Sequence, residues 1–111
     1  MPASPDAERV RALNDILRRT LSGGTLVFTP GLVALGRASQ EVVLAAVAAF
    51  DRFDADNDPY REHDFGALEA AGERLFFKID YYDRTLTGAS PDPADSAVTR
   101  RVLTVMLADE Y

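Results

Sequence analysis

The chain of 111 residues contains no cysteine and no tryptophan, and its only histidine is His63. Without cysteine it can form neither a disulfide framework nor a thiol nucleophile nor a cysteine-ligated metal site. A single histidine also excludes zinc sites and phosphohydrolase centres that are built from several histidine ligands. Any catalytic hypothesis that uses a histidine therefore depends on His63 alone.

Long hydrophobic segments are absent as well. The longest apolar run, VVLAAVAAF from Val42 to Phe50, is less than half of the roughly 20 residues that a membrane-spanning helix needs. The first residues, MPASPDAERVRAL, lack the basic start and apolar stretch of a secretory signal. We therefore expect a cytoplasmic protein without membrane contact, folded as one domain over residues 1–111.

Basic residues are outnumbered by acidic ones. The chain has 12 lysines and arginines against 18 aspartates and glutamates, which gives a net charge of −6. Most of the surplus lies between Asp51 and Asp64, where six acids face two arginines. An acidic chain repels nucleic acid, so direct nucleic-acid binding is not expected. The charge favours instead a protein partner with a basic surface.

A first helix is predicted to begin at Pro5, with Ser4 as its cap, and to end at Gly23-Gly24. Apolar residues recur at helical spacing from Val10 to Leu21. Arg18 and Arg19 lie near the negative end of this helix, where they are expected to complement its dipole and to stay solvated.

One strand and two further helices follow from composition. TLVFT, Thr25 to Thr29, is β-branched and aromatic and ends at Pro30-Gly31, which predicts a strand. At the edge of a sheet this strand could pair with its copy in a second molecule and form a homodimer. A broad apolar stripe predicts a helix from a Ser39 cap to about Phe53, and a wide apolar arc predicts another near Ala97 to Asp109.

The segment HDFGALEAAGERLFFKIDYYD, His63 to Asp83, predicts a β-hairpin that turns at Ala71-Gly72. In that register Phe65 opposes Lys78 and His63 opposes Asp80. We therefore expect an α+β fold, with about three helices packed on a small, largely antiparallel sheet of about three strands, in the order α-β-α-β-β-α. The face of the hairpin toward the core is predicted to carry Leu68, Leu75, Phe77, Ile79 and Tyr81.

The run DADND resembles a calcium loop but does not complete one. Asp54, Asp56 and Asp58 match the first three ligand positions of an EF-hand. The required glycine is replaced by Pro59, and the bidentate glutamate by Phe65. Two alternatives stay open: a turn in which these side chains bind nearby backbone, and a looser magnesium or calcium site built from Asp56, Asp58 and Asp64.

Catalytic motifs are few. The segment GGTLVFTPG, Gly23 to Gly31, matches neither glycine-rich phosphate loop, and no serine has the context of a nucleophile elbow. One constellation remains, in which Asp80 orients His63 as a general base across the hairpin, near Lys78 and Tyr82. Such a pair of residues is more often structural, holding the end of a strand. We expect a protein that is not an enzyme and uses no cofactor.

Five segments resemble one family of small bacterial proteins that is catalogued only as a domain of unknown function. They are RALNDILRRTLSGG (11–24), DNDPYREHDFG (56–66), FKIDYYD (77–83), SPDPADSAVT (90–99) and RVLTVMLADEY (101–111). The resemblance covers nearly the whole chain but implies no activity. Members of the family often lie among plasmid and other mobile-element genes, which favours a role in element maintenance or in blocking host defence.

The family motifs also indicate where a functional surface lies. On the predicted hairpin, Glu62 to Asp64 lie beside Asp80 to Tyr82, so two distant motifs converge at one end of the sheet. The hypothesis is a non-catalytic module that binds a basic protein. Its alternatives are an inhibitor of host defence that imitates nucleic-acid charge, and a small metal-dependent hydrolase or nuclease. The predicted binding residues are Asp56, Asp58, Tyr60, Glu62, His63, Asp64, Asp80 and Tyr82.

Overall fold

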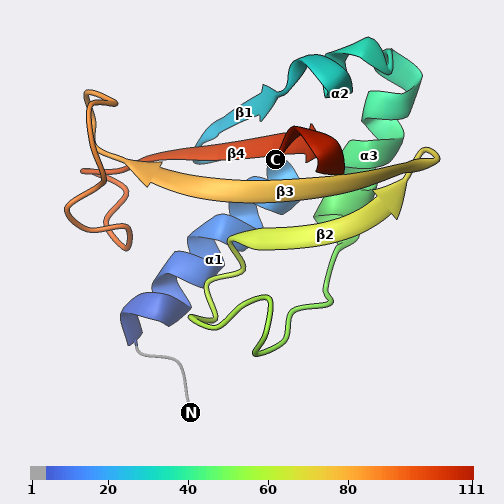
Figure 1. The fold of residues 1–111 in the computed structure, drawn as a ribbon. Helices are drawn as coiled ribbons and strands as arrows, with labels where there is room; N and C mark the ends of the chain where they lie inside the picture. The colour runs from blue at the N-terminus through green and yellow to red at the C-terminus, as the bar shows by residue number, and fades with distance from the viewer. Residues whose placement is uncertain (1–4) are drawn as a thin grey trace.

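A computed structural model describes residues 5–111 of the chain, so the predicted cap at Ser4 lies outside the described residues. Helices cover one face of a four-stranded sheet with the strand order β1-β4-β3-β2 (Figure 1). β1 is parallel to β4, and the other pairs are antiparallel. Within the described residues, no helix is long and apolar enough to cross a membrane. The elements are α1 (Pro5–Thr20), β1 (Thr25–Phe28), α2 (Pro30–Ala34), α3 (Arg37–Ala49), β2 (Phe65–Ala70), β3 (Glu73–Tyr82), β4 (Arg100–Leu107) and the short 3₁₀ helix η1 (Ala108–Glu110).

The predicted α+β class is confirmed, but the sheet is mixed and has four strands instead of about three. The error lies in the last predicted helix, since most of that segment forms β4 in the interior of the sheet. Leu103 and Val105 are buried against the helices, while Val102 and Thr104 are half-buried on the opposite face. A strand that is apolar on both faces shows no clean alternation, so it imitates the wide apolar arc of a buried helix.

The hairpin of β2 and β3 is confirmed in the predicted register. Phe65 pairs with Lys78, and Glu69 pairs with Arg74. The turn residue Ala71 has φ 54° and is followed by a glycine with φ 77°. Two left-handed residues in a two-residue loop make a type I′ turn, whose twist matches that of the flanking strands.

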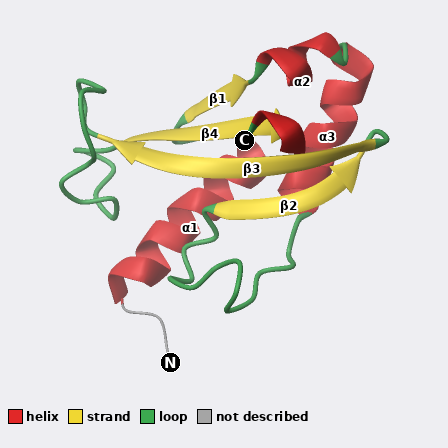
Figure 2. Cartoon of the chain, viewed as in Figure 1, coloured by secondary structure: helices red, strands yellow, loops and turns green. Residues whose placement is uncertain are grey.

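The helix ends differ from the predicted ones by a few residues. α1 ends at Thr20, because Leu21 already has a left-handed φ of 61°. α3 begins at Arg37, two residues before the expected Ser39 cap, and its N-cap is Gly36 with φ 87°. α3 also ends at Ala49, since Phe50 turns into an extended conformation. The segment from Phe50 to Asp64 is therefore a long connection without regular structure (Figure 2).

The hydrophobic core lies between the helices and the sheet. Phe77 of β3 is fully buried, and its ring meets that of Phe50 edge to face at 5.4 Å. Gly66 of β2 faces these rings so closely that a Cβ there would lie 2.2 Å from Phe77 and 2.8 Å from Phe50. The core comprises Leu17, Leu32, Val43, Val47, Phe50, Leu75, Phe77, Ile79, Leu103 and Val105.

Among the described residues, the end of the chain covers part of the opposite face of the sheet (Figure 1). The ring of Tyr111 contacts those of Phe65 and Phe76, with centroids at 5.9 and 5.4 Å. Glu110 fastens this end: its carboxylate accepts hydrogen bonds from the Thr29 hydroxyl at 2.6 Å and from the Gly31 amide at 2.8 Å. These two bonds hold the pKa of the exposed Glu110 carboxyl below its usual value.

Candidate functional site

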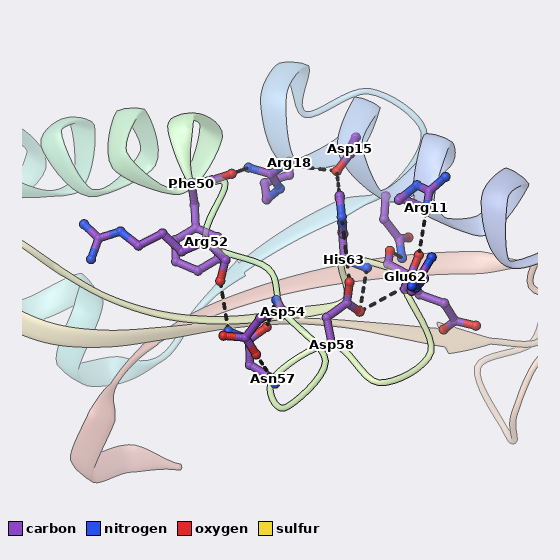
Figure 3. A network of polar contacts seen from close by, with 12 residues as sticks. Arg11, Asp15, Arg18, Phe50, Arg52, Asp54, Asn57, Asp58, Glu62 and His63 are labelled. Carbon is purple, nitrogen blue, oxygen red and sulfur yellow. Dashed lines mark hydrogen bonds and ion pairs between the residues drawn. The ribbon is translucent and has the colours of Figure 1, made fainter. Parts of the chain in front are cut away.

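The acidic loop from Asp51 to Asp64 is stabilised by its own side chains (Figure 3). Asp54 Oδ1 accepts hydrogen bonds from the amides of Asp56 at 2.9 Å and Asn57 at 3.0 Å. Asn57 Oδ1 accepts a hydrogen bond from the Asp54 amide at 3.0 Å, and Asn57 Nδ2 donates to the Arg52 carbonyl at 2.9 Å. The first part of the loop thus forms the self-bonded aspartate and asparagine turn that the sequence left open as an alternative to a metal site.

Asp58 organises the second part of the loop. Asp58 is only 4% exposed, and its Oδ1 accepts hydrogen bonds from the amides of Glu62 at 3.0 Å and His63 at 3.1 Å. Within that turn Arg61 and His63 adopt left-handed φ angles of 58° and 56°. Such angles cost free energy in residues with a side chain, so the carboxylate of Asp58 has a structural task.

His63 lies before β2, and it contacts α1 instead of β3. Its Nδ1 lies 2.9 Å from Asp15 Oδ1, and its ring stacks on Phe53 at 3.8 Å. The predicted pair of His63 with Asp80 is wrong, because Asp80 accepts a hydrogen bond from Lys78 at 2.8 Å. The physical reason is the left-handed backbone at His63, two residues before the ladder begins, which turns its side chain out of the strand alternation.

Arg18 connects α1, the end of α3 and the acidic loop. Its side chain is fully buried, and its Nη1 donates to the carbonyls of Val47, Ala48 and Phe50 at 2.8, 3.0 and 2.7 Å. The expectation of a solvated Arg18 is therefore wrong. Helical spacing could have indicated this burial. Arg18 follows Asn14 by four residues, and both lie on the face of α1 that carries Val10 and Leu17.

Asp15 lies between the two basic groups of this site. Its Oδ1 accepts from Arg18 Nη2 at 3.0 Å as well as contacting His63 at 2.9 Å. Burial raises the pKa of the Asp15 carboxyl, but the bonds to His63 and Arg18 outweigh it and place that pKa below its usual value. Asp15 is therefore held in its charged form by two neighbours. It lies in the motif at residues 11–24, but no role had been predicted for it.

A second network joins the two motifs that were predicted to converge. Tyr81 of β3 donates its hydroxyl hydrogen to Glu62 Oε1 at 3.0 Å and accepts from Asn14 Nδ2 at 2.7 Å. The buried Arg101 donates to Asn14 Oδ1 at 2.7 Å and to the carbonyl of Pro93. The convergence of Glu62 with the β3 motif is confirmed, although Tyr81 had been expected in the core and was not among the predicted binding residues.

Burial governs the charge of the acids at this junction. It raises the pKa of the Glu62 carboxyl, and the bond from Tyr81 only partly offsets that effect. It also raises the pKa of the Asp64 carboxyl, which the nearby charges of Asp58 and Asp80 raise further. Because their pKa values are raised, these two carboxylates lose their negative charge at a higher pH than exposed carboxylates do.

The predicted binding residues divide into three groups. Asp56 and Tyr60 are exposed at the loop tip, where Tyr60 keeps 75% of its surface in solvent. Asp58, Glu62, His63 and Asp64 lie behind it, buried or half-buried. Asp80 and Tyr82 point to the helix-free face of the sheet, beside Lys78. Among residues 5–111, no group of three acidic or histidine side chains could hold a metal ion, so Asp56, Asp58 and Asp64 do not form a site together.

An open hollow of about 460 Å³ lies beside His63. Its walls carry charges of both signs, from Arg11 and Arg61 on one hand and Asp54 and Asp58 on the other. Both acids already accept backbone hydrogen bonds, so neither is free to bind a ligand with its full charge.

Comparison with known protein families identifies one family that matches the chain. A family model described as "Protein of unknown function (DUF3768)" matches residues 28–110, which include β2, β3, β4 and the acidic loop. The chain belongs to this family. The resemblance seen in the sequence motifs is thereby confirmed, although the motif at residues 11–24 lies outside the matched region. No curated protein and no solved structure matched the chain.

Proposed function

We propose that this member of the family is a non-catalytic module that binds a basic protein partner through the tip of its acidic loop. One observation carries the proposal: side chains of the loop itself hold its backbone by hydrogen bonds, while Tyr60 of the same loop is 75% exposed and Asp54 and Asp56 are exposed as well. An exposed tyrosine on a rigid support loses little conformational entropy on binding. Tyrosines are also enriched at the centres of protein interfaces.

The charges around Tyr60 fit a basic partner. Asp51, Asp54 and Asp56 are exposed, and the side chain of Asp56 forms no hydrogen bond with any residue of the described chain. Carboxylates at the rim of an interface speed association with a basic surface and disfavour acidic ones. The same exposed acids support the narrower version in which the module imitates nucleic-acid phosphates to block a host defence protein.

A small hydrolase is the second candidate, because the contact of His63 with Asp15 resembles the orientation of a general base and lies beside the hollow. Its other ring nitrogen, however, lies 3.7 Å from Asp58 Oδ2. Facing a carboxylate, that nitrogen is poorly placed to take a proton from a substrate. This geometry favours the binding module.

The test is capture of partners from an extract of the native host with Asp56→Asn/Tyr60→Ala as the binding variant. Both side chains are exposed, so the variant should fold. Leu86→Ala/Asp109→Asn, which changes one exposed apolar and one exposed acidic side chain away from the loop, is the matched control. We expect one basic protein to be retained by wild type and control and lost by the binding variant. Retention by all three chains would refute the loop as the binding surface.

A further inference from the structure

β2 forms one edge of the sheet, and its hydrogen-bonding pattern leaves every second residue unpaired. The amide of Ile79 donates to the Asp64 carbonyl at 2.8 Å. Because directly bonded pairs alternate along an antiparallel ladder, Gly66, Leu68 and Ala70 also bond to β3. The amides and carbonyls of the remaining residues point outward, and no residue in the described range 5–111 bonds to them. These outward residues are Phe65, Ala67 and Glu69.

A hollow of about 660 Å³ lies between this edge and the end of α3. On the helix side it is lined by the small side chains of Ala46 and Ala49, and on the strand side by Leu68. A strand added to β2 would direct alternate side chains toward this hollow and toward the helix-free face. An edge strand beside a helix is the arrangement with which several domains bind extended peptides, using backbone bonds for affinity and pockets for selectivity.

The charges that line the hollow balance, since Asp51 and Glu69 stand against Arg52 and Arg74, so the selectivity at this edge depends on Glu69. Glu69 is exposed, and although Arg74 lies opposite it on β3, no ion pair joins them or joins Glu69 to any other described residue. A lysine or arginine on an added strand would provide the missing partner. A second copy of β2 would not, because pairing about Ala67 puts Phe65 of the copy opposite Glu69. Two copies with a net charge of −6 each would also repel each other.

We propose that β2 accepts an extended, basic segment of the partner protein as a fifth, antiparallel strand. The segment places a lysine or arginine opposite Glu69 and an apolar side chain in the hollow between β2 and α3. Its chain then continues past Phe65 toward the acidic loop. The inference rests on the proposed function, because the loop and the edge then belong to one continuous surface for one partner.

The probe is the synthetic peptide Lys-Val-Lys-Val-Lys-Val-Lys, and the readout is hydrogen exchange of single backbone amides by nuclear magnetic resonance. The amides of Phe65, Ala67 and Glu69 should exchange fast in the free protein and become protected on binding. A peptide with glutamate in place of each lysine is the control and should not protect them. If these amides stay unprotected at millimolar peptide, the proposal is overturned.

Two variants separate an added strand from nonspecific attraction. Ala67→Pro removes one outward donor without removing a bond to β3, and it should weaken binding about tenfold or more. Glu69→Lys changes only an exposed side chain, so it decides the matter if Ala67→Pro does not fold. It should transfer the preference to the glutamate peptide. An unchanged preference overturns the proposal.

The failure of this inference is distinguishable from the failure of the proposed function. Perturbations confined to the loop Asp51 to Asp64 would overturn strand addition and leave the loop as the binding surface. Protection of the β2 amides that persists in Asp56→Asn/Tyr60→Ala would support strand addition and count against the loop.

Discussion

Replacing Arg18 by methionine tests whether one buried guanidinium holds α1, α3 and the acidic loop together. Methionine retains much of the apolar volume but none of the donors. The substitution deprives the carbonyls of Val47, Ala48 and Phe50 of donors at 2.8, 3.0 and 2.7 Å, and it leaves Asp15 with only His63 as a basic neighbour.

The magnitude follows from what the lost donors leave behind. Removing one partner of a buried charge pair costs about 3–5 kcal/mol, and each orphaned buried polar group costs about 1–3 kcal/mol. The Asp15 side chain is 18% exposed, so water can replace part of its lost bond. We therefore expect Arg18→Met to lower the free energy of unfolding by about 3 kcal/mol, a large part of the roughly 5–15 kcal/mol of an ordinary domain.

Urea unfolding followed by circular dichroism measures this loss. The matched control is Arg19→Met, the next residue on α1, whose side chain is exposed and should change stability by no more than about 0.5 kcal/mol. The double variant Arg18→Met/Asp15→Asn should cost less than the sum of its single changes, because the two residues share a bond. A loss below about 1 kcal/mol for Arg18→Met would refute the argument that this guanidinium stabilises the fold.

Two further predictions concern the core and the end of the chain. Gly66→Ala should lower the free energy of unfolding by about 1–3 kcal/mol or more, because its Cβ would lie 2.2 Å from the ring of Phe77. The control is Gly88→Ala, whose Cβ would have its nearest atom at 3.6 Å and which should change the free energy of unfolding little in the same urea titration. Glu110→Gln should lower stability at neutral pH but not in acid. The folded state depresses the pKa of Glu110, so its stabilising effect is complete above the unfolded pKa of about 4.3 and disappears as pH falls through the folded one. A stability gap between wild type and Glu110→Gln that stays constant below that pH would contradict this assignment.

The sequence predicted the local structure better than the long-range contacts. The register of the hairpin was predictable, because a two-residue turn at Ala71-Gly72 fixes every pair between β2 and β3. β4 was not, since a strand with apolar residues on both faces lacks the alternation that distinguishes it from a helix. Its place between β1 and β3 depends on a parallel pairing of residues 25–28 with residues 102–105, and no local pattern encodes such a pairing.

The candidate site shows the same division. Asp54, Asn57 and Asp58 bond within a few residues along the chain, so the self-bonded turn could be anticipated from composition. The partner of His63 could not, because Asp15 lies 48 residues away on α1. The predicted pairing with Asp80 required the alternation of the strand to extend to His63. The left-handed φ of 56° at His63 ends the alternation before that residue.

The structural role of the acidic loop supports its proposed binding role. A connection without regular structure would ordinarily lose entropy when it binds a partner. Here Asp54 and Asp58 form backbone bonds and Arg18 fixes the carbonyl of Phe50, so much of that entropy is already lost on folding. The acids that remain exposed at the tip can then act on a partner at little further cost. This division predicts that changes at Asp58 reduce binding by loosening the loop, and that changes at Asp56 reduce it while the fold stays intact.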